Sequence, residues 1–423
     1  MIPADLIITG ADVVATCAGI APRAGAAQGD IAAVAIGSVA AWQGRIVAVG
    51  PAAAVAAAIT LQPGATVIDG TGRTVVPGFV DPHTHAVFAG DRRDELARRL
   101  RGATYAEIAA SGGGIVRTVA ATRAASEDEL VALARPRLAE MLAQGTTTCE
   151  IKSGYGLDVA TELRQLRAIR RLGGVQPIDV SATFMGAHEV PAEYRGRREA
   201  YVQLVIDEML PAVAAEGLAE WNDVFCEHGV FSPDESTRIL EAGKALGLTP
   251  RIHADELGAS GGALTAAAVG AISADHLIHV DEAGADAMAG AGVIATLLPA
   301  AAFFLKLGRY APARMLVARH VPVALATDLN PGGGFTPSLP FVMTLAIFGM
   351  GLTLEEALVA ATINGAAALG RQHAVGSLET GKQMDAVVVE GRLADLLRVG
   401  APAIAAVVKR GVVVYGNPAR RQA

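Results

Sequence analysis

Histidine and aspartate residues occur at three places where they could bind one metal ion. His83 and His85 form a His-x-His pair in DPHTH, His253 stands in RIHAD, and Asp328 stands in ATDLN. Alternation along an extended segment puts His83 and His85 on one side, so both imidazoles can reach the same ion. Three neutral imidazoles and one carboxylate suit zinc, or iron in a similar site. The sequence therefore predicts one zinc or iron ion per chain.

These residues can meet only if distant segments come together. Between residues 76 and 376, short apolar runs alternate with amphipathic stretches, which is the pattern of βαβ units. Eight runs are expected to be strands: residues 75–80, 146–151, 178–183, 223–226, 250–253, 271–275, 293–298 and 321–326. Eight such units predict an α/β fold of the TIM type, a (β/α)8 barrel.

Helix starts between the expected strands carry capping boxes, in which a Ser or Thr is followed three residues later by Glu. The pairs are Ser126 with Glu129, Ser232 with Glu235, and Thr353 with Glu356. They support the alternation of strands and helices.

The polar residues fall at the ends of the expected strands. His83 and His85 follow the first strand, His253 ends the fifth, and Asp328 ends the eighth. Another ionisable residue, His276, ends the sixth. Barrel enzymes carry their chemistry at the C-terminal ends of the strands, so all five side chains are expected to face one site. A His-x-His pair alone could be a chance pair on a strand, and it gains weight only from this context.

The two flanks of the barrel region look alike. Residues 1–75 and 377–423 contain short β-rich runs separated by Gly and Pro turns. We expect them to pair into one small composite β domain, a β-sandwich, beside a barrel domain of residues 76–376.

Composition excludes several functional classes. A formal charge of −7 argues against a nucleic-acid surface and means that an anionic substrate would need a local cation. No apolar stretch is long enough to span a bilayer, and the opening residues 1–5 do not resemble a secretory signal, so we expect a cytoplasmic protein without a membrane partner. Three unpaired cysteines predict no disulfide framework. Apolar outer faces on several helices permit a homodimer.

The arrangement of His-x-His after strand one, His after strand five and Asp after strand eight resembles the amidohydrolase superfamily, where this pattern surrounds a catalytic metal. Several relatives that bind two metals place a lysine at the end of strand four. Here strand four runs into Cys226 and Glu227, while Lys152 belongs to strand two. A single metal is therefore expected.

Longer segments resemble the imidazolonepropionase family, which opens the imidazolone ring in histidine breakdown. They are PGFVDPHTHAVFAGDRRDE, LRGATYAEIAASGGGIVRTVAATR, EIKSGYGLD, MGAHEVPAEY, HADELGASGGALTAA, SADHL and ATDLNPG. The resemblance implies a hydrolase that uses a metal-activated water to cleave the ring C–N bond of a small-molecule substrate, 4-imidazolone-5-propanoate. The product would be N-formimino-L-glutamate.

The resemblance also implies which residues contact the substrate. They are Arg92, Tyr155, His188 and Glu256, with Asn330, Gly332 and Gly333 in the loop that holds the propionate end. Arg92 stands in a charge run that could be a solvated face, but an acidic protein that binds a carboxylate needs such a cation near the metal motif. Many relatives carry Thr or Ser in place of Gly333, so here only the backbone could make that contact.

Catalytic roles follow from the expected positions. Asp328 would take a proton from the water, and His276 would stabilise the oxyanion. The proton for the leaving nitrogen could come from Glu256 or from Asp328.

Two rival functions remain open because the metal pattern alone does not choose a substrate. One is a metal-dependent hydrolase or deaminase that acts on a purine, pyrimidine or triazine ring. The other is a binding protein that keeps the barrel and has lost the chemistry. Arg92 and the Asn330 loop favour a substrate with a carboxylate arm.

Overall fold

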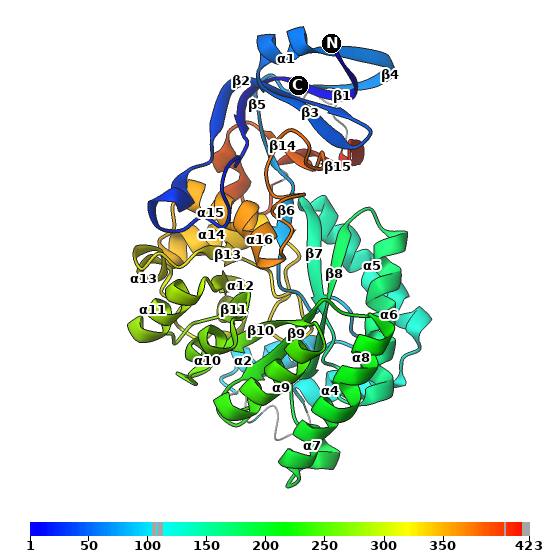
Figure 1. Cartoon of the computed structure of the whole chain (residues 1–423), viewed down its shortest axis with the longest axis vertical. Helices are drawn as coiled ribbons and strands as arrows, with labels where there is room; N and C mark the ends of the chain where they lie inside the picture. The colour runs from blue at the N-terminus through cyan, green and yellow to red at the C-terminus, as the bar shows by residue number, and fades with distance from the viewer. Residues whose placement is uncertain (104–106, 108–112, 402, 417–423) are drawn as a thin grey trace.

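Two separate sheets organise the molecule. The computed structural model describes residues 1–103, 107, 113–401 and 403–416. Within them, one eight-stranded sheet is parallel and forms the barrel, and a second eight-stranded mixed sheet is built from the two ends of the chain (Figure 1). No helix among the described residues is long and apolar enough to cross a membrane.

The barrel confirms the predicted eight strands. In sheet order they are β6 (Phe79–Asp81), β7 (Thr146–Lys152), β8 (Asp179–Ala187), β9 (Trp221–Cys226), β10 (Thr249–Ala254), β11 (Ser273–His276), β12 (Ile294–Leu297) and β13 (Val323–Leu325). The chain closes the ring just beyond β6 and β13, where Thr84 and Leu329 form a parallel bridge. The residues that follow these two strands are thereby brought together.

Helices cover the outside of the barrel, and three of them begin at the predicted capping boxes. In each box the Ser or Thr hydroxyl accepts the backbone N–H three residues on, and the Glu side chain accepts the N–H of the cap residue. These helices are α5 (Glu127–Ala143), α9 (Pro233–Ala245) and α15 (Leu354–Ala361).

The remaining helical segments complete the barrel and the connections. They are α1 (Ala52–Ala58), α2 (Arg93–Leu100), α4 (Ile115–Ala124), α6 (Val159–Val175), α7 (Arg198–Leu204), α8 (Leu210–Glu216), α10 (Gly262–Val269), α11 (Glu282–Ala291), α12 (Pro299–Leu305), α13 (Ala313–Ala318), α14 (Leu339–Met350) and α16 (Ile363–Ala368), with the short turns η1 (Gly25–Gly29), η2 (Ala192–Tyr194), η3 (Val205–Met209) and η4 (Leu393–Leu397).

The second sheet joins the head and the tail of the chain, as predicted. Its order is β16 (Val412–Gly416), β15 (Ile404–Lys409), β14 (Ala386–Glu390), β5 (Arg73–Pro77), β1 (Ile2–Ala15), β2 (Ala33–Trp42) and β3 (Arg45–Pro51), with β4 (Ile59–Asp69) paired to β1. Arg45 bridges to Gln383, and Ile46 shares one apolar core with Val408 from the opposite end. The sheet therefore folds over its own core.

The single strand expected over residues 75–80 is wrong. The structure divides it at Gly78, with β5 in the second sheet and β6 in the barrel. A Cβ on Gly78 would stand 2.3 Å from Thr147 Oγ1, so only glycine lets the chain pass this close to β7. The crossing from one sheet to the other therefore lies at residue 78.

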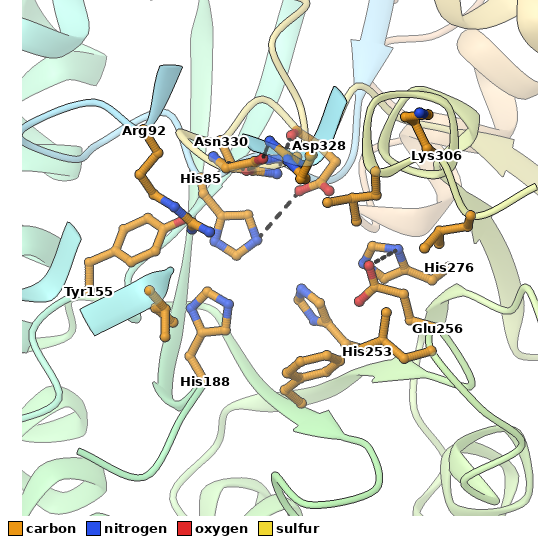
Figure 2. A pocket seen from close by; sticks show the side chains of 18 of the residues that line it. His85, Arg92, Tyr155, His188, His253, Glu256, His276, Lys306, Asp328 and Asn330 are labelled. Carbon is orange, nitrogen blue, oxygen red and sulfur yellow. Dashed lines mark hydrogen bonds and ion pairs between the residues drawn. The ribbon is translucent and has the colours of Figure 1, made fainter. Parts of the chain in front are cut away.

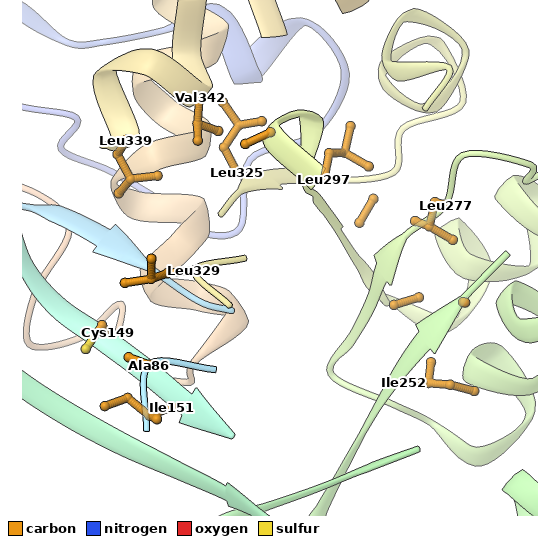
Figure 3. Packing of buried hydrophobic residues seen from close by; sticks show 14 of the residues in the cluster. Ala86, Cys149, Ile151, Ile252, Leu277, Leu297, Leu325, Leu329, Leu339 and Val342 are labelled. Atoms are coloured by element: carbon orange, nitrogen blue, oxygen red, sulfur yellow. The ribbon is translucent and has the colours of Figure 1, made fainter. Parts of the chain in front are cut away.

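Alternation along the barrel strands separates apolar from polar side chains. Ile151, Ile252 and other apolar residues pack in a cluster with the surrounding helices (Figure 3). Their neighbours in sequence, Glu150, Lys152 and Arg251, are also fully buried. Successive residues of a strand point to opposite faces, so these charged side chains lie inside the barrel. The site is thus built above a charged interior.

Candidate active site

A pocket of about 370 Å³ lies at the C-terminal ends of the barrel strands. Figure 2 shows Arg92 and Tyr155 at one side, Glu256 and His276 at the other, and histidines between them. Apart from His83, which lies beneath the pocket wall, the predicted site residues line it: His85, Arg92, Tyr155, His188, His253, Glu256, His276, Asp328, Asn330, Gly332 and Gly333.

The three predicted histidine ligands form one cluster. His83, His85 and His253 each offer a nitrogen, and these nitrogens all lie within 4.8 Å of one another. Asp328 Oδ1 stands 3.7 Å from Nε2 of both His83 and His85. Ligand atoms of one tetrahedral zinc ion are about 3.3 Å apart when each bond is about 2.0 Å. The spacing therefore fits a shared ion with little movement.

Hydrogen bonds fix which nitrogen of His83 and of His253 faces the cluster. His83 Nδ1 donates to Asp275 Oδ2 at 2.6 Å, and His253 Nδ1 donates to Asp223 Oδ1 at 3.0 Å. The opposite nitrogen of His83, Nε2, is buried and has no hydrogen-bond partner among the described residues. An unprotonated, unpartnered nitrogen is the form that binds a metal, and carboxylate partners of this kind are usual behind metal-binding histidines.

The electrostatics keep the rings of His83 and His85 neutral. Burial lowers the pKa of His83 well below its usual value, and the charge of Lys152 lowers it further. Burial also lowers the pKa of His85, with a further contribution from His188. Burial raises the pKa of Asp328 to about 7, although its hydrogen bond with Asn330 opposes the shift. Neutral imidazoles favour metal binding because no proton has to be displaced.

The backbone is strained where three strands end. Asp255 after β10, His276 at the end of β11 and Asp328 after β13 have φ angles of 51°, 76° and 52°. Such left-handed conformations are costly for residues other than glycine and cluster at functional sites. Two of these residues, His276 and Asp328, are predicted to be catalytic, and Asp255 directly precedes the third predicted residue, Glu256.

The cationic side of the pocket is built on the start of α2. Arg92 is buried, and its Nε donates to Glu95 Oε2 at 2.9 Å. Arg99, two turns beyond Arg92, donates to the carbonyl of Gly332 at 2.6 Å. Sequence reasoning found Arg92 and missed Glu95 and Arg99. Their spacing of three and seven residues from Arg92, which puts them on one helix face, was the available signal.

Tyr155 and His188 form the wall next to the metal cluster. The His188 ring stacks on His85 with 5.0 Å between centroids, and Tyr155 lies 5.3 Å from His188. His188 Nδ1 donates to the carbonyl of Gly154, 3.0 Å away, so its Nε2 carries no proton in the neutral ring. Burial lowers the pKa of His188 to about 3, and His253 adds to the shift. His188 is therefore a hydrogen-bond acceptor.

The Asn330 side chain shapes the loop after β13. Its Nδ2 donates to the carbonyl of Asp328 at 2.8 Å, and its Oδ1 accepts from the amides of Gly332 and Gly333 at 2.8 and 2.6 Å. The glycine amides expected near the propionate thus already have a partner within the loop. A backbone contact from Gly333 to substrate stays a prediction.

Glu256 lies beside His276 on the opposite side of the pocket. Its Oε1 is 3.6 Å from His276 Nδ1. Burial raises the pKa of Glu256 well above its usual range, and the nearby Asp328 and Glu227 carboxylates raise it further. Glu227, which sequence reasoning missed, accepts the amides of Leu257 and Gly258 and so holds this loop in place. Glu256 is placed to carry a proton.

Known proteins share both the sequence and this architecture. The model of the amidohydrolase family matches residues 74–417. Imidazolonepropionase of Symbiobacterium thermophilum is 53% identical over 426 residues and covers 100% of both chains. The imidazolonepropionase of Geobacillus kaustophilus is 50% identical over 400 residues, 94% of each chain. The chain belongs to the imidazolonepropionase group of the amidohydrolase family.

Solved structures resemble this amidohydrolase in fold alone. A variant of atrazine chlorohydrolase from Arthrobacter aurescens, complexed with zinc and atraton, is 18% identical with a TM-score of 0.74, over 98% of this chain and 96% of its own. An adenosine deaminase from Xanthomonas campestris with bound zinc is 19% identical with a TM-score of 0.68, over 98% and 94%. Both support the predicted barrel with its appended sheet.

Proposed function

We propose that this amidohydrolase is an imidazolonepropionase, which hydrolyses the ring C–N bond of 4-imidazolone-5-propanoate to N-formimino-L-glutamate. The relatives that are half identical over nearly the whole chain support this reaction. The observation that carries it in the structure is one pocket with the three-histidine cluster on one side and the buried Arg92 on another. A ring that bears a carboxylate arm fits that pairing.

The metal site would consist of His83, His85, His253 and Asp328 and hold one zinc or iron ion. When bound, such an ion lowers the pKa of a coordinated water from about 15.7 towards about 7 and polarises a carbonyl. The unpartnered Nε2 of His83 and the spacing to Asp328 support this ligand set. Zinc and iron both accept it.

Substrate binding would start from the carboxylate. The terminal nitrogens of Arg92 would pair with the propionate, since its Nε is already held by Glu95. His188, with an unprotonated Nε2, would accept a ring N–H, and the Tyr155 ring would pack beside it. These contacts would bring the ring carbonyl over the histidine cluster.

Proton transfer would use the carboxylates on the other side. Asp328 would accept the proton of the attacking water, and His276 would donate a hydrogen bond to the developing oxyanion. Glu256 would deliver the proton to the leaving nitrogen, because its raised pKa keeps it protonated. Asp328, once protonated, is the alternative donor.

The decisive experiment is turnover of 4-imidazolone-5-propanoate by purified protein, followed through its ultraviolet absorbance. Metal-free protein and protein reloaded with zinc or with iron are compared. We expect turnover that depends on metal. Absence of turnover in every metal-loaded sample, or ammonia release from a purine, pyrimidine or triazine, would refute the proposed substrate and favour the deaminase or ring hydrolase alternative.

The predicted homodimer and cytoplasmic location stay proposals. Apolar side chains on the described surface, such as Phe303 and Phe348, are compatible with a second copy. Sedimentation equilibrium of the purified chain would test the dimer.

A further inference from the structure

One lysine lies at the centre of the charged barrel interior, beneath the proposed metal site. Lys152 ends β7 and is completely buried. Its Nζ lies 2.7 Å from Asp223 Oδ2, 2.8 Å from Glu150 Oε1 and 3.6 Å from Asp275 Oδ2. The contacts with Asp223 and Glu150 are hydrogen bonds that Nζ donates, and the contact with Asp275 is a longer ion pair.

Each of these three carboxylates holds a different part of the histidine cluster. Asp223 accepts both Nδ1 and the backbone N–H of His253 through Oδ1. Asp275 accepts Nδ1 of His83. Glu150 accepts the backbone N–H of Thr84, the residue between His83 and His85, at 3.1 Å.

The cation also makes this arrangement electrostatically tolerable. Three carboxylates buried in one place repel one another, and a buried charge is costly unless it is paired and hydrogen-bonded. Arg251 contributes a second cation near Asp275 at 3.4 Å, but it mainly donates to the carbonyls of Pro82 and Ala368. Burial lowers the pKa of Lys152, yet Asp223 and Glu150 raise it more, so the ammonium stays charged.

We propose that Lys152 is a positioning residue that sets the affinity of the metal site by orienting the three carboxylates that fix His83, Thr84 and His253. This inference rests on the proposed metal site. The carboxylates and the histidine ligands lie between Lys152 and the proposed ion, so Lys152 contacts neither the ion nor the substrate. It differs from the lysine that several two-metal relatives place at the end of strand four, because it ends the second barrel strand and its Nζ is paired with carboxylates.

The test compares Lys152→Met with Lys409→Met in the full chain. Lys409 is a matched control: it is also buried, and it also pairs with two carboxylates, Asp385 at 2.6 Å and Asp179 at 2.7 Å. The Asp179 pair links β15 to barrel strand β8, and the Asp385 pair stays within the second sheet, next to β14. Zinc affinity is measured by competition with a chromophoric chelator, and thermal unfolding is measured on the metal-free proteins.

We expect Lys152→Met to bind zinc at least about 10-fold more weakly, as loss of outer contacts to metal ligands commonly weakens binding about 10- to 100-fold. Lys409→Met should unfold at a lower temperature and keep wild-type zinc affinity. Lys152→Arg, which keeps the charge, should recover part of the affinity. Wild-type zinc affinity in Lys152→Met, or an equal loss in Lys409→Met, would overturn the inference.

A charge-balanced variant guards against misfolding. Lys152→Met combined with Glu150→Gln removes one positive and one negative charge, so the net charge of the buried cluster is unchanged. The same loss of zinc affinity is expected, since Asp223 loses its hydrogen-bond donor and Asp275 loses the ion pair with the same cation. Wild-type affinity in this double variant would contradict the positioning role. Wild-type protein that binds no zinc or iron would instead refute the metal site itself, and the inference with it.

Discussion

Gly332 lies so close to the Arg92 guanidinium that no side chain fits between them. A Cβ on Gly332 would stand 2.4 Å from Arg92 Nη1 and 2.5 Å from its Cζ. The φ angle of Gly332 is not in the left-handed region, so the need for glycine here is steric. The loop after β13 and the start of α2 are therefore fitted to each other at the cationic side of the pocket.

Gly332→Ala should displace Arg92 and weaken substrate binding. A misplacement of about 1 Å can cost about 100-fold in rate, so we expect kcat/KM to fall about 10- to 100-fold, mainly through KM. Gly290→Ala on the outer helix α11 is the control, because its added Cβ would meet no atom within 4 Å. Steady-state kinetics on both variants test this prediction. Equal KM values in the two would show that the close approach of Gly332 to Arg92 does not matter for substrate binding.

Arg92→Ala should also raise KM, and by more than Gly332→Ala does. Hydrogen bonds to charged groups contribute about 1.5–3 kcal/mol, which corresponds to a KM about 10- to 150-fold higher. Arg117→Ala, which removes an exposed pair with Asp94, should leave KM unchanged. For a substrate analogue without the carboxylate, the wild-type protein and Arg92→Ala should have the same KM. An unchanged KM in Arg92→Ala would move the propionate to another cation.

Asp328→Asn should abolish turnover and spare the fold. The amide keeps the size of the side chain but can neither accept the proton nor serve as an anionic ligand, so kcat should fall by at least about 100-fold. Circular dichroism would show a native spectrum. Asp286→Asn, at an exposed pair with Arg319, should retain full activity. Appreciable turnover by Asp328→Asn would require a different base.

The activity should decline at alkaline pH because of Glu256. Burial and the Asp328 and Glu227 carboxylates raise its pKa, so the carboxyl keeps its proton until the pH rises through that raised value. A general acid is active only while protonated, so kcat/KM should fall on the alkaline side. Glu256→Gln should lose about 100-fold or more in kcat and lack this limb in a profile from about pH 6 to about pH 10. An identical limb in Glu256→Gln would assign the ionisation to another group.

Local signals were enough to predict most of the elements. Ser126, Ser232 and Thr353 mark helix starts because capping depends on residues that are neighbours in sequence. The division at Gly78 could not be read in this way, since it depends on contact with Thr147 from another strand. The sequence of residues 75–80 is typical of a strand whether the segment lies in one sheet or is divided between two.

The candidate site was predicted where residue type alone carries the chemistry. His83, His85, His253 and Asp328 were identified because few side chains bind metals. Asp223 and Asp275 were missed, although a metal-binding histidine usually needs a carboxylate behind it and both stand on barrel strands next to the histidines. Asp275 lies in register with His253 on the neighbouring strand, yet it accepts from His83, and His253 is held by Asp223 of β9. Only the folded chain provides this choice of partners.

Asp275→Asn tests whether that carboxylate matters to the metal. Asp275 Oδ2 accepts Nδ1 of His83 at 2.6 Å and is fully buried. The amide is neutral and can present its NH₂ group to the ring, so His83 would be held less firmly in the tautomer that leaves Nε2 unprotonated. We expect metal affinity to fall about 10- to 100-fold, with activity restored by excess zinc or iron. Asp385→Asn removes a similarly buried carboxylate that pairs with Lys409, and it should lower thermal stability alone. Full metal affinity in Asp275→Asn would mean that the cluster is held by its backbone and not by its hydrogen bonds.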